Sequence, residues 1–219
     1  MSFFDAAYQG TPPWDIGRPQ PAFVRLEERG EIVGRVLDLG CGTGENALYF
    51  ARVGHEAWGF DSAPTAIRLA REKSARRGLP VRFEVADALE LGRRPERFET
   101  ITDCGLFHTF DDEERPRYAA SLRAALGSPG RVHVLCFSDR EPAEWGGPRR
   151  VTQDEIRATF GEGWRVRSIR AERFATRFEE IRGEAWLATV EPSGADRVEG
   201  ERFERVRERP PVRGASTSP

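Results

Sequence analysis

The segment from Val36 to Asn46, VLDLGCGTGEN, constrains the fold of this chain more than any other part of its sequence. Its apolar first half predicts a buried strand, its glycines predict a turn, and residues 47–51 continue as a helix. Glycines between a parallel strand and a helix let a ligand lie against bare backbone at the helix N-terminus. A dinucleotide fingerprint, G-x-G-x-x-G, is disfavoured because Glu45 stands where its third glycine belongs.

Three acidic residues stand in or just after predicted strands. Asp38 lies in the first strand, Asp61 ends the second and Asp87 follows the third. An acid at the first strand suits a ligand with a cationic amino group and a sulfonium, and a carboxylate at Asp61 can accept hydrogen bonds from both ribose hydroxyls of a nucleoside. One such aspartate alone is better explained as a turn or helix cap. Three at this spacing behind a glycine turn favour a ligand site.

This pattern resembles motif I and the motifs after it in the class I S-adenosylmethionine-dependent methyltransferases. The resemblance implies S-adenosyl-L-methionine as the cofactor and, at Asp87, an acid that meets the adenine amino group. The expected cofactor-binding residues lie in the N-terminal segment and around the ends of the first four strands: Trp14, Asp38, Gly40, Cys41, Gly42, Gly44, Asn46, Asp61, Ser62, Asp87, Ala88, Asp103 and Cys104.

From residue 35 onward, predicted strands and helices alternate, which is typical of a doubly wound parallel sheet. We expect helices at 44–53, 63–77, 112–126 and 152–160, and strands at 35–39, 55–60, 80–85, 98–103 and 130–137. Two more strands, around 164–171 and 181–190, fit the antiparallel hairpin that closes methyltransferase sheets. The expected fold class is α/β: a doubly wound, Rossmann-like, seven-stranded, mostly parallel sheet with this C-terminal antiparallel hairpin.

The 219 residues are enough for one large domain, which we divide into three regions. Residues 1–30 are rich in glycine, proline and aromatic residues and are expected to form an N-terminal lid. Residues 31–191 are expected to form the methyltransferase domain that the resemblance implies. Residues 192–219 have little apolar surface to bury, so we expect a disordered tail there.

Composition excludes several classes of partner. The formal net charge is −2, so no global positive field attracts nucleic acid or an anionic membrane. No apolar run reaches roughly 18 residues and the N-terminus has no basic region, which argues against membrane spanning and secretion. Three widely spaced cysteines favour reduced thiols in the cytoplasm. We expect a cytoplasmic monomer or weak homodimer.

The segment Thr11–Pro21, TPPWDIGRPQP, resembles the N-terminal segment of thiopurine S-methyltransferase-like enzymes, a group that includes bacterial enzymes acting on heterocyclic toxins. The segments 105–108 and 137–151 point to the same small-molecule branch, and the resemblance covers about residues 8–190. It implies that the N-terminal segment folds over the cofactor, with Trp14 near the methionine portion. The branch implies a small-molecule substrate without naming it.

The substrate is expected at the carboxyl ends of the strands, where ligands bind in open α/β sheets. A hydroxyl or ring N–H acceptor needs a general base, for which His108 with Asp139 is the candidate pair. A thiol, selenide or halide needs only desolvation. His108 can instead cap the next helix or lie beneath the substrate without titrating. Further candidate substrate contacts are the aromatic residues Phe107 and Phe110, with Trp145 as a third candidate wall of the same apolar pocket. A basic pair after a Gly-Gly-Pro turn, Arg149 and Arg150, is a candidate for holding an anionic substrate.

Rival functions stay open. A nicotinamide-dependent oxidoreductase shares this fold class but not the glycine spacing. A binding module, or an enzyme that uses S-adenosylmethionine for another reaction, could carry the same motifs. We expect no metal, because Cys41, Cys104 and His108 come from separate strands without paired ligand spacing.

Overall fold

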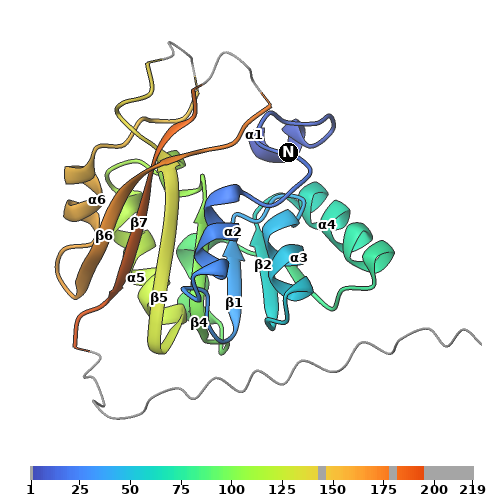
Figure 1. The fold of residues 1–219 in the computed structure, drawn as a ribbon, viewed down its shortest axis with the longest axis horizontal. Coiled ribbons are helices and arrows are strands. Elements are labelled where there is room, and N and C mark those ends of the chain that lie inside the picture. Colours follow the sequence, from blue (N-terminus) through green and yellow to red (C-terminus); the bar gives the residue numbers. More distant parts are fainter. Residues whose placement is uncertain (1, 143–146, 178–181, 195–219) are drawn as a thin grey trace, which may run out of the picture.

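The computed structural model describes residues 2–142, 147–177 and 182–194 (Figure 1). Helices and strands alternate from residue 36 to residue 137, as the sequence pattern predicts. The helices are α1 Phe3–Ala7, α2 Pro21–Glu28, α3 Glu45–Arg52, α4 Pro64–Arg77, α5 Glu114–Ala125 and α6 Gln153–Thr159, with short 3-10 helices η1 Ala88–Arg93 and η2 Phe107–Thr109. The strands are β1 Val36–Leu39, β2 Ala57–Asp61, β3 Arg82–Val85, β4 Phe98–Cys104, β5 Leu126–Phe137, β6 Trp164–Arg173 and β7 Glu184–Pro192.

The seven strands form one sheet in the order β3-β2-β1-β4-β5-β7-β6. The pairs from β3 to β5 are parallel, whereas β7 runs antiparallel to both β5 and β6. This confirms the predicted fold class, including the C-terminal hairpin. The order reverses between β1 and β4, so the carboxyl ends of these two strands are where a ligand is expected.

Helices cover both faces of the sheet (Figure 1). Val36 packs with α2 and α3 on one face, whereas Leu37 and Leu39 pack with α5 and α6 on the other. This alternation follows from the twofold side-chain period of a strand. Asp38 therefore points to the α2–α3 face, the same face as the N-terminal part of the chain.

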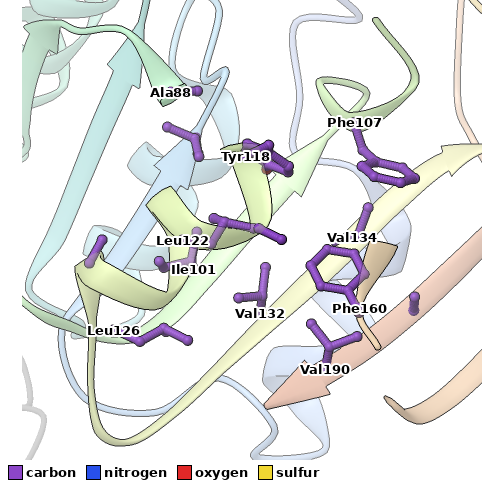
Figure 2. Close-up of a cluster of buried hydrophobic side chains, with 14 of the residues drawn as sticks. Ala88, Ile101, Phe107, Tyr118, Leu122, Leu126, Val132, Val134, Phe160 and Val190 are labelled. Carbon is purple, nitrogen blue, oxygen red and sulfur yellow. The ribbon is translucent and has the colours of Figure 1, made fainter. Parts of the chain in front are cut away.

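The core on the α5 side is made of aromatic and branched aliphatic side chains (Figure 2). Tyr118 and Leu122 on α5 lie over Ile101, Val132 and Val134 of β4 and β5, and all five are fully buried. Burying each such side chain stabilises the fold by about 1.5–3 kcal/mol. This packing fixes the end of β4, from which the site residues project.

The helices differ from the sequence prediction in some details. The helix α4 begins at Pro64, one residue after the expected start, with Ala63 as its N-cap and no side chain capping this end. The helix α1 was not predicted; it is only five residues long, with Ser2 as its cap. The expected tail lies almost wholly outside the described residues, and so does Trp145.

Candidate functional site

The turn after β1 has a backbone that only glycine adopts easily. Gly40, Gly42 and Gly44 have φ of 69°, 53° and 88°, in the left-handed region that disfavours other residues. A Cβ added to Gly42 would lie 2.6 Å from the hydroxyl oxygen of Tyr8, and one added to Gly44 would lie 2.5 Å from the ring of Phe83. The turn is therefore shaped by close neighbours as well as by its own dihedral angles.

Asp38 is a fully buried carboxylate beneath this turn. Its Oδ1 accepts hydrogen bonds from Thr102 at 2.9 Å and from the Asn46 amide at 3.4 Å. Its Oδ2 is buried and has no hydrogen-bond partner within the described ranges. Burial raises the pKa of Asp38 to about 7, because the charged form is poorly solvated there. An unpaired buried carboxylate oxygen suits a cationic group of a ligand.

Asp61 joins the end of β2 to the glycine turn. Its two carboxylate oxygens accept hydrogen bonds from the backbone N–H groups of Gly42 and Ala63, both at 2.8 Å. Asp87, beyond β3, is exposed and accepts from the N–H of Leu89 at 2.9 Å. The two aspartates cap local backbone and keep further acceptor capacity for a ligand.

The N-terminal segment lies against the glycine turn. Oδ2 of Asp15 accepts a hydrogen bond from Thr43 at 2.8 Å, and the side-chain oxygen of Asn46 accepts one from the N–H of Gln20 at 2.9 Å. The indole N–H of Trp14 donates to the hydroxyl of Tyr8 at 2.9 Å. These contacts border an open pocket of about 450 Å³, a volume that includes space open to solvent. The pocket is lined by Tyr8, Trp14, Asp15, Ile16, Arg18, Gln20, Gly40, Cys41, Gly42, Thr43, Glu45, Asn46, Cys104 and Phe174.

Asp103 is fully buried and both its carboxylate oxygens are bonded within the chain. Its Oδ2 accepts from the Tyr118 hydroxyl at 2.6 Å, and its Oδ1 accepts from the N–H of Leu106 at 2.8 Å. The N–H of Phe107 also donates to this carboxylate at 3.0 Å. Burial raises the pKa of Asp103 to about 6. Asp103 thus holds the turn that follows β4, whereas its neighbour Cys104 lines the pocket.

His108 lies in a stack of aromatic rings beside this turn. Its ring is 5.2 Å from that of Phe137 at an interplanar angle of 14°, and Phe137 stacks in turn on Phe174 at 4.8 Å. Nδ1 of His108 accepts the backbone N–H of Phe137 at 3.2 Å. Burial, with a smaller effect of Arg115, lowers the pKa of His108 to about 3.

Asp139, the predicted partner of His108, has another contact in the structure. Its Oδ1 accepts the indole N–H of Trp186 at 3.0 Å. Phe107 is fully buried inside the core of the α5 face, where its ring centroid lies 5.8 Å from that of Phe160. Phe110 is partly buried and packs against the ring of Tyr118. The structure therefore brings neither Asp139 nor Phe107 into the pocket around the glycine turn.

Arg149, the first residue of the basic pair, lies beside α6 and the residues just before α5. Arg149 forms ion pairs with Asp112 and Glu155, and Glu155 also pairs with buried Arg115 at 3.0 Å. Arg150 is partly buried. These ion pairs give Arg149 a role in joining helices, and its predicted contact with substrate stays a prediction.

Sequence reasoning missed several pocket residues. Asp15 and Arg18 lie inside the proline-rich segment that it singled out, so their charges in that segment were an available signal. Phe174 had no such signal, because it follows the edge strand β6 and reaches the pocket only through the fold.

Among the described residues, no cluster of three or more histidine, cysteine or acidic side chains has an arrangement that could hold a metal ion. In the same ranges, each helix is too short or too polar to cross a bilayer.

The chain is similar to known methyltransferases. The model of a family described as methyltransferase domain matches residues 36–130. The chain is 39% identical over 212 residues to a 2-heptyl-1-hydroxyquinolin-4(1H)-one methyltransferase of Mycobacteroides abscessus, covering 86% of this chain and 93% of that protein. It is 30% identical over 141 residues to a probable thiol methyltransferase 2 of Arabidopsis thaliana, covering 64% of this chain and 62% of that protein.

Two solved structures are also similar to this chain. One, from a study of the conversion of a disulfide bond into a thioacetal group during echinomycin biosynthesis, is 41% identical with a TM-score of 0.78, covering 86% of this chain and 91% of that one. A magnesium protoporphyrin IX methyltransferase from Synechocystis PCC 6803 with bound SAH is 17% identical, with a TM-score of 0.62. The match covers 78% of this chain and 80% of that chain, and at this identity it shows likeness of fold alone.

Proposed function

We propose that this chain, which belongs to the S-adenosylmethionine-dependent methyltransferases, methylates a small, planar heteroaromatic compound of the N-hydroxyquinolinone kind. The acceptor atom is the hydroxyl oxygen of that compound. The observation that carries the proposal is the 39% identity to a 2-heptyl-1-hydroxyquinolin-4(1H)-one methyltransferase, because it extends over 93% of that protein. Phe174 supports it, since this aromatic side chain lines the pocket and flat rings favour stacked contacts with such a side chain.

The residues around the glycine turn fit the cofactor of this family. The unpaired buried Oδ2 of Asp38 suits the ammonium group, and Asp61 suits the ribose hydroxyls. The bare backbone of Gly40 and Gly42 lets a ligand approach closely. Arg18 lines the same pocket and suits the carboxylate. When bound, S-adenosylmethionine supplies a methyl group already activated on a sulfonium.

Because the methyl group is already activated, the protein has to position the two reactants and exclude water. Tyr8 and Trp14 cover the glycine turn, and Gln20 ties this segment to the end of β6 through two hydrogen bonds with Ala175, at 2.9 and 3.0 Å. The N–H of Arg177 also donates to the carbonyl of Pro13 at 2.9 Å. These contacts support a lid made of the N-terminal segment, as the sequence predicts.

A second candidate acceptor is sulfur. It is favoured by the likeness to a probable thiol methyltransferase 2 and by the 41% identity to the structure from the thioacetal study. A thiolate would bind in the same pocket and needs no base. We also propose, from the sequence, a cytoplasmic monomer or weak homodimer that does not bind nucleic acid, which the net charge of −2 supports.

The test is a panel of acceptors incubated with the full chain and S-adenosylmethionine. The panel holds alkyl N-hydroxyquinolinones, their N–H parent compounds, simple thiols and phenols, and mass spectrometry identifies the methylated product. Asp61→Ala is the control for background methylation. Turnover of the N-hydroxy compounds but not of the N–H parents is expected. Turnover of thiols alone would favour the second candidate, and cofactor binding without any turnover would refute this choice of acceptor.

A further inference from the structure

A hydrogen bond between the backbone and His108 restricts what this ring can do. The N–H of Phe137 donates to Nδ1 of His108 at 3.2 Å. The strand β4 ends at Cys104, and the next residue, Gly105, donates to the carbonyl of Leu135. Phe137 lies two residues beyond Leu135, the last residue of β5 that pairs with β4. Buried N–H groups are almost always paired, and here the imidazole provides the acceptor.

This contact fixes the tautomer of the neutral ring. A nitrogen that accepts a hydrogen bond carries no hydrogen, so the hydrogen of the neutral imidazole lies on Nε2. To act as a base at Nε2, the ring would need the other tautomer, whose Nδ1–H would point at the N–H of Phe137. The geometry therefore leaves Nε2 as a donor.

The surroundings of His108 favour the same neutral form. Phe137 on β5 and Phe174 beyond β6 pack against the ring, and a Cβ on Gly105 would lie 3.2 Å from its Cε1. The charged group that acts on it is Arg115 of α5, and together with burial this lowers the pKa of His108 to about 3.

The carboxylates of Asp103 and Asp139 are hydrogen-bonded to groups other than His108. Asp103, on β4, binds Tyr118 and the turn after β4, and Asp139, beyond β5, binds Trp186. Within the described part of the chain, Nε2 of His108 therefore has no hydrogen-bond partner.

We infer that His108 donates a hydrogen bond from Nε2 to the methyl acceptor, and that the acceptor arrives already ionised at the atom to be methylated. The inference rests on the proposed function and narrows its substrate class. With an anionic acceptor the transfer balances without a proton: the acceptor oxygen or sulfur forms the new bond to carbon, and the electrons of the broken C–S bond stay on sulfur. N-hydroxy heterocycles, acidic phenols and thiols fit this requirement, whereas simple alcohols and amide N–H groups do not.

The tautomer is tested first, without any substrate. Long-range ¹H–¹⁵N spectra of the labelled full chain distinguish Nδ1–H, Nε2–H and charged imidazole, with His108→Gln used to assign the signals. We expect the Nε2–H pattern for His108, unchanged from about pH 9 to pH 5. His55→Gln, a change at the other end of the sheet, is the matched control. An Nδ1–H pattern, or titration near neutral pH, would overturn the inference whether or not any acceptor is turned over.

Two variants then separate the possible roles of the ring. In His108→Asn the side-chain oxygen can take the place of Nδ1 and keep the bond to Phe137, but the Nε2 donor is lost. In His108→Gln the terminal amide can keep the donor without a titratable group. For a donor, kcat/KM should fall by about 10- to 100-fold in the asparagine variant and much less in the glutamine variant. If His108 is a base, kcat/KM should fall by about 10²–10⁴-fold in both variants. If the ring is purely structural, the glutamine variant should lose more activity than the asparagine variant.

The pH dependence provides the last check. Across acceptors of different acidity, the ionisation seen in kcat/KM should follow the pKa of each acceptor and should be the same in the wild type and in His108→Gln. An ionisation that stays at one pH for all acceptors and disappears in the variant would instead belong to His108 and refute the donor role. Failure of every acceptor would refute the proposed function alone, since the spectra decide the tautomer independently.

Discussion

Oδ2 of Asp15 accepts a hydrogen bond from Oγ1 of Thr43 at 2.8 Å, and so joins the N-terminal segment to the glycine turn. The same hydroxyl oxygen accepts from the ammonium group of Lys73 at 2.6 Å, and Lys73 also pairs with Glu45 at 2.8 Å. The lid, the turn and α4 therefore meet at one threonine. A change at this contact should weaken cofactor binding more than it lowers the stability of the core.

The first prediction concerns this contact. Asp15→Ala should weaken S-adenosylmethionine binding by about 10-fold, the scale for losing one charge-assisted hydrogen bond. Deletion of residues 1–18 should abolish turnover and leave the sheet folded. Calorimetry and circular dichroism measure the two effects. Arg68→Ala, which breaks an exposed ion pair with Glu72, is the control and should change neither. A truncated chain that methylates at the parent rate would refute the lid.

The sheet was predictable because its signals are local. Val36–Leu39 is a short apolar run before glycines, and Pro64 stands where the first turn of a helix tolerates it. The C-terminal hairpin was visible as two adjacent strands without a helix between them. Such patterns involve residues that are close in the sequence, so they can be recognised without knowing the fold.

The details of the site depend on contacts between distant residues. Gln20 bonds to Ala175, and the N–H of Phe137 bonds to His108, and neither pair shares a local pattern. The pairing of His108 with Asp139 was expected because the two follow neighbouring strands, but Trp186 on β7 binds the carboxylate of Asp139 instead. The fold class was predictable, whereas the competition between side chains for one partner was not.

Asp61 is the subject of the second prediction. Asp61→Ala should weaken cofactor binding by about 2–3 kcal/mol, because the ribose loses a charged hydrogen-bond partner. The N–H of Gly42 would lose its acceptor as well, so thermal stability should also fall. Asp61→Asn keeps an acceptor oxygen and should lose less affinity. Isothermal titration of both variants with S-adenosylhomocysteine measures this, and an unchanged affinity in Asp61→Ala would exclude the assignment.

A third prediction follows from the contact of Asp139 with Trp186. Asp139→Asn keeps an oxygen that can accept the indole N–H, so kcat/KM should change by less than about threefold. Asp139→Leu should lower the melting temperature, because the indole N–H loses its acceptor. Steady-state rates and thermal denaturation distinguish these effects. If the asparagine variant lost about 100-fold or more in rate, Asp139 would have to be the base instead.

The last prediction uses the buried charge of Asp38. Burial raises its pKa from 3.8 to about 7, so the folded chain binds this proton more tightly than the unfolded chain does. Between these two pH values the free energy of unfolding therefore falls as pH rises, and above pH 7 the whole penalty is present. Asp38→Asn removes the charge and keeps an oxygen for Thr102 and Asn46.

The unliganded Asp38→Asn variant should thus be more stable than the wild type at pH 8, by up to about 4 kcal/mol, and should lose this gain near pH 4. It should also bind S-adenosylmethionine more weakly, because the ammonium group loses its carboxylate partner. Thermal denaturation from pH 4 to pH 8, with and without S-adenosylhomocysteine, measures both effects. The charge of Asp103 adds to the raised pKa of Asp38, so the difference between the two proteins reports the titration of Asp38 together with its effect on Asp103. A difference in stability that is the same at every pH would mean that Asp38 is not the group that titrates.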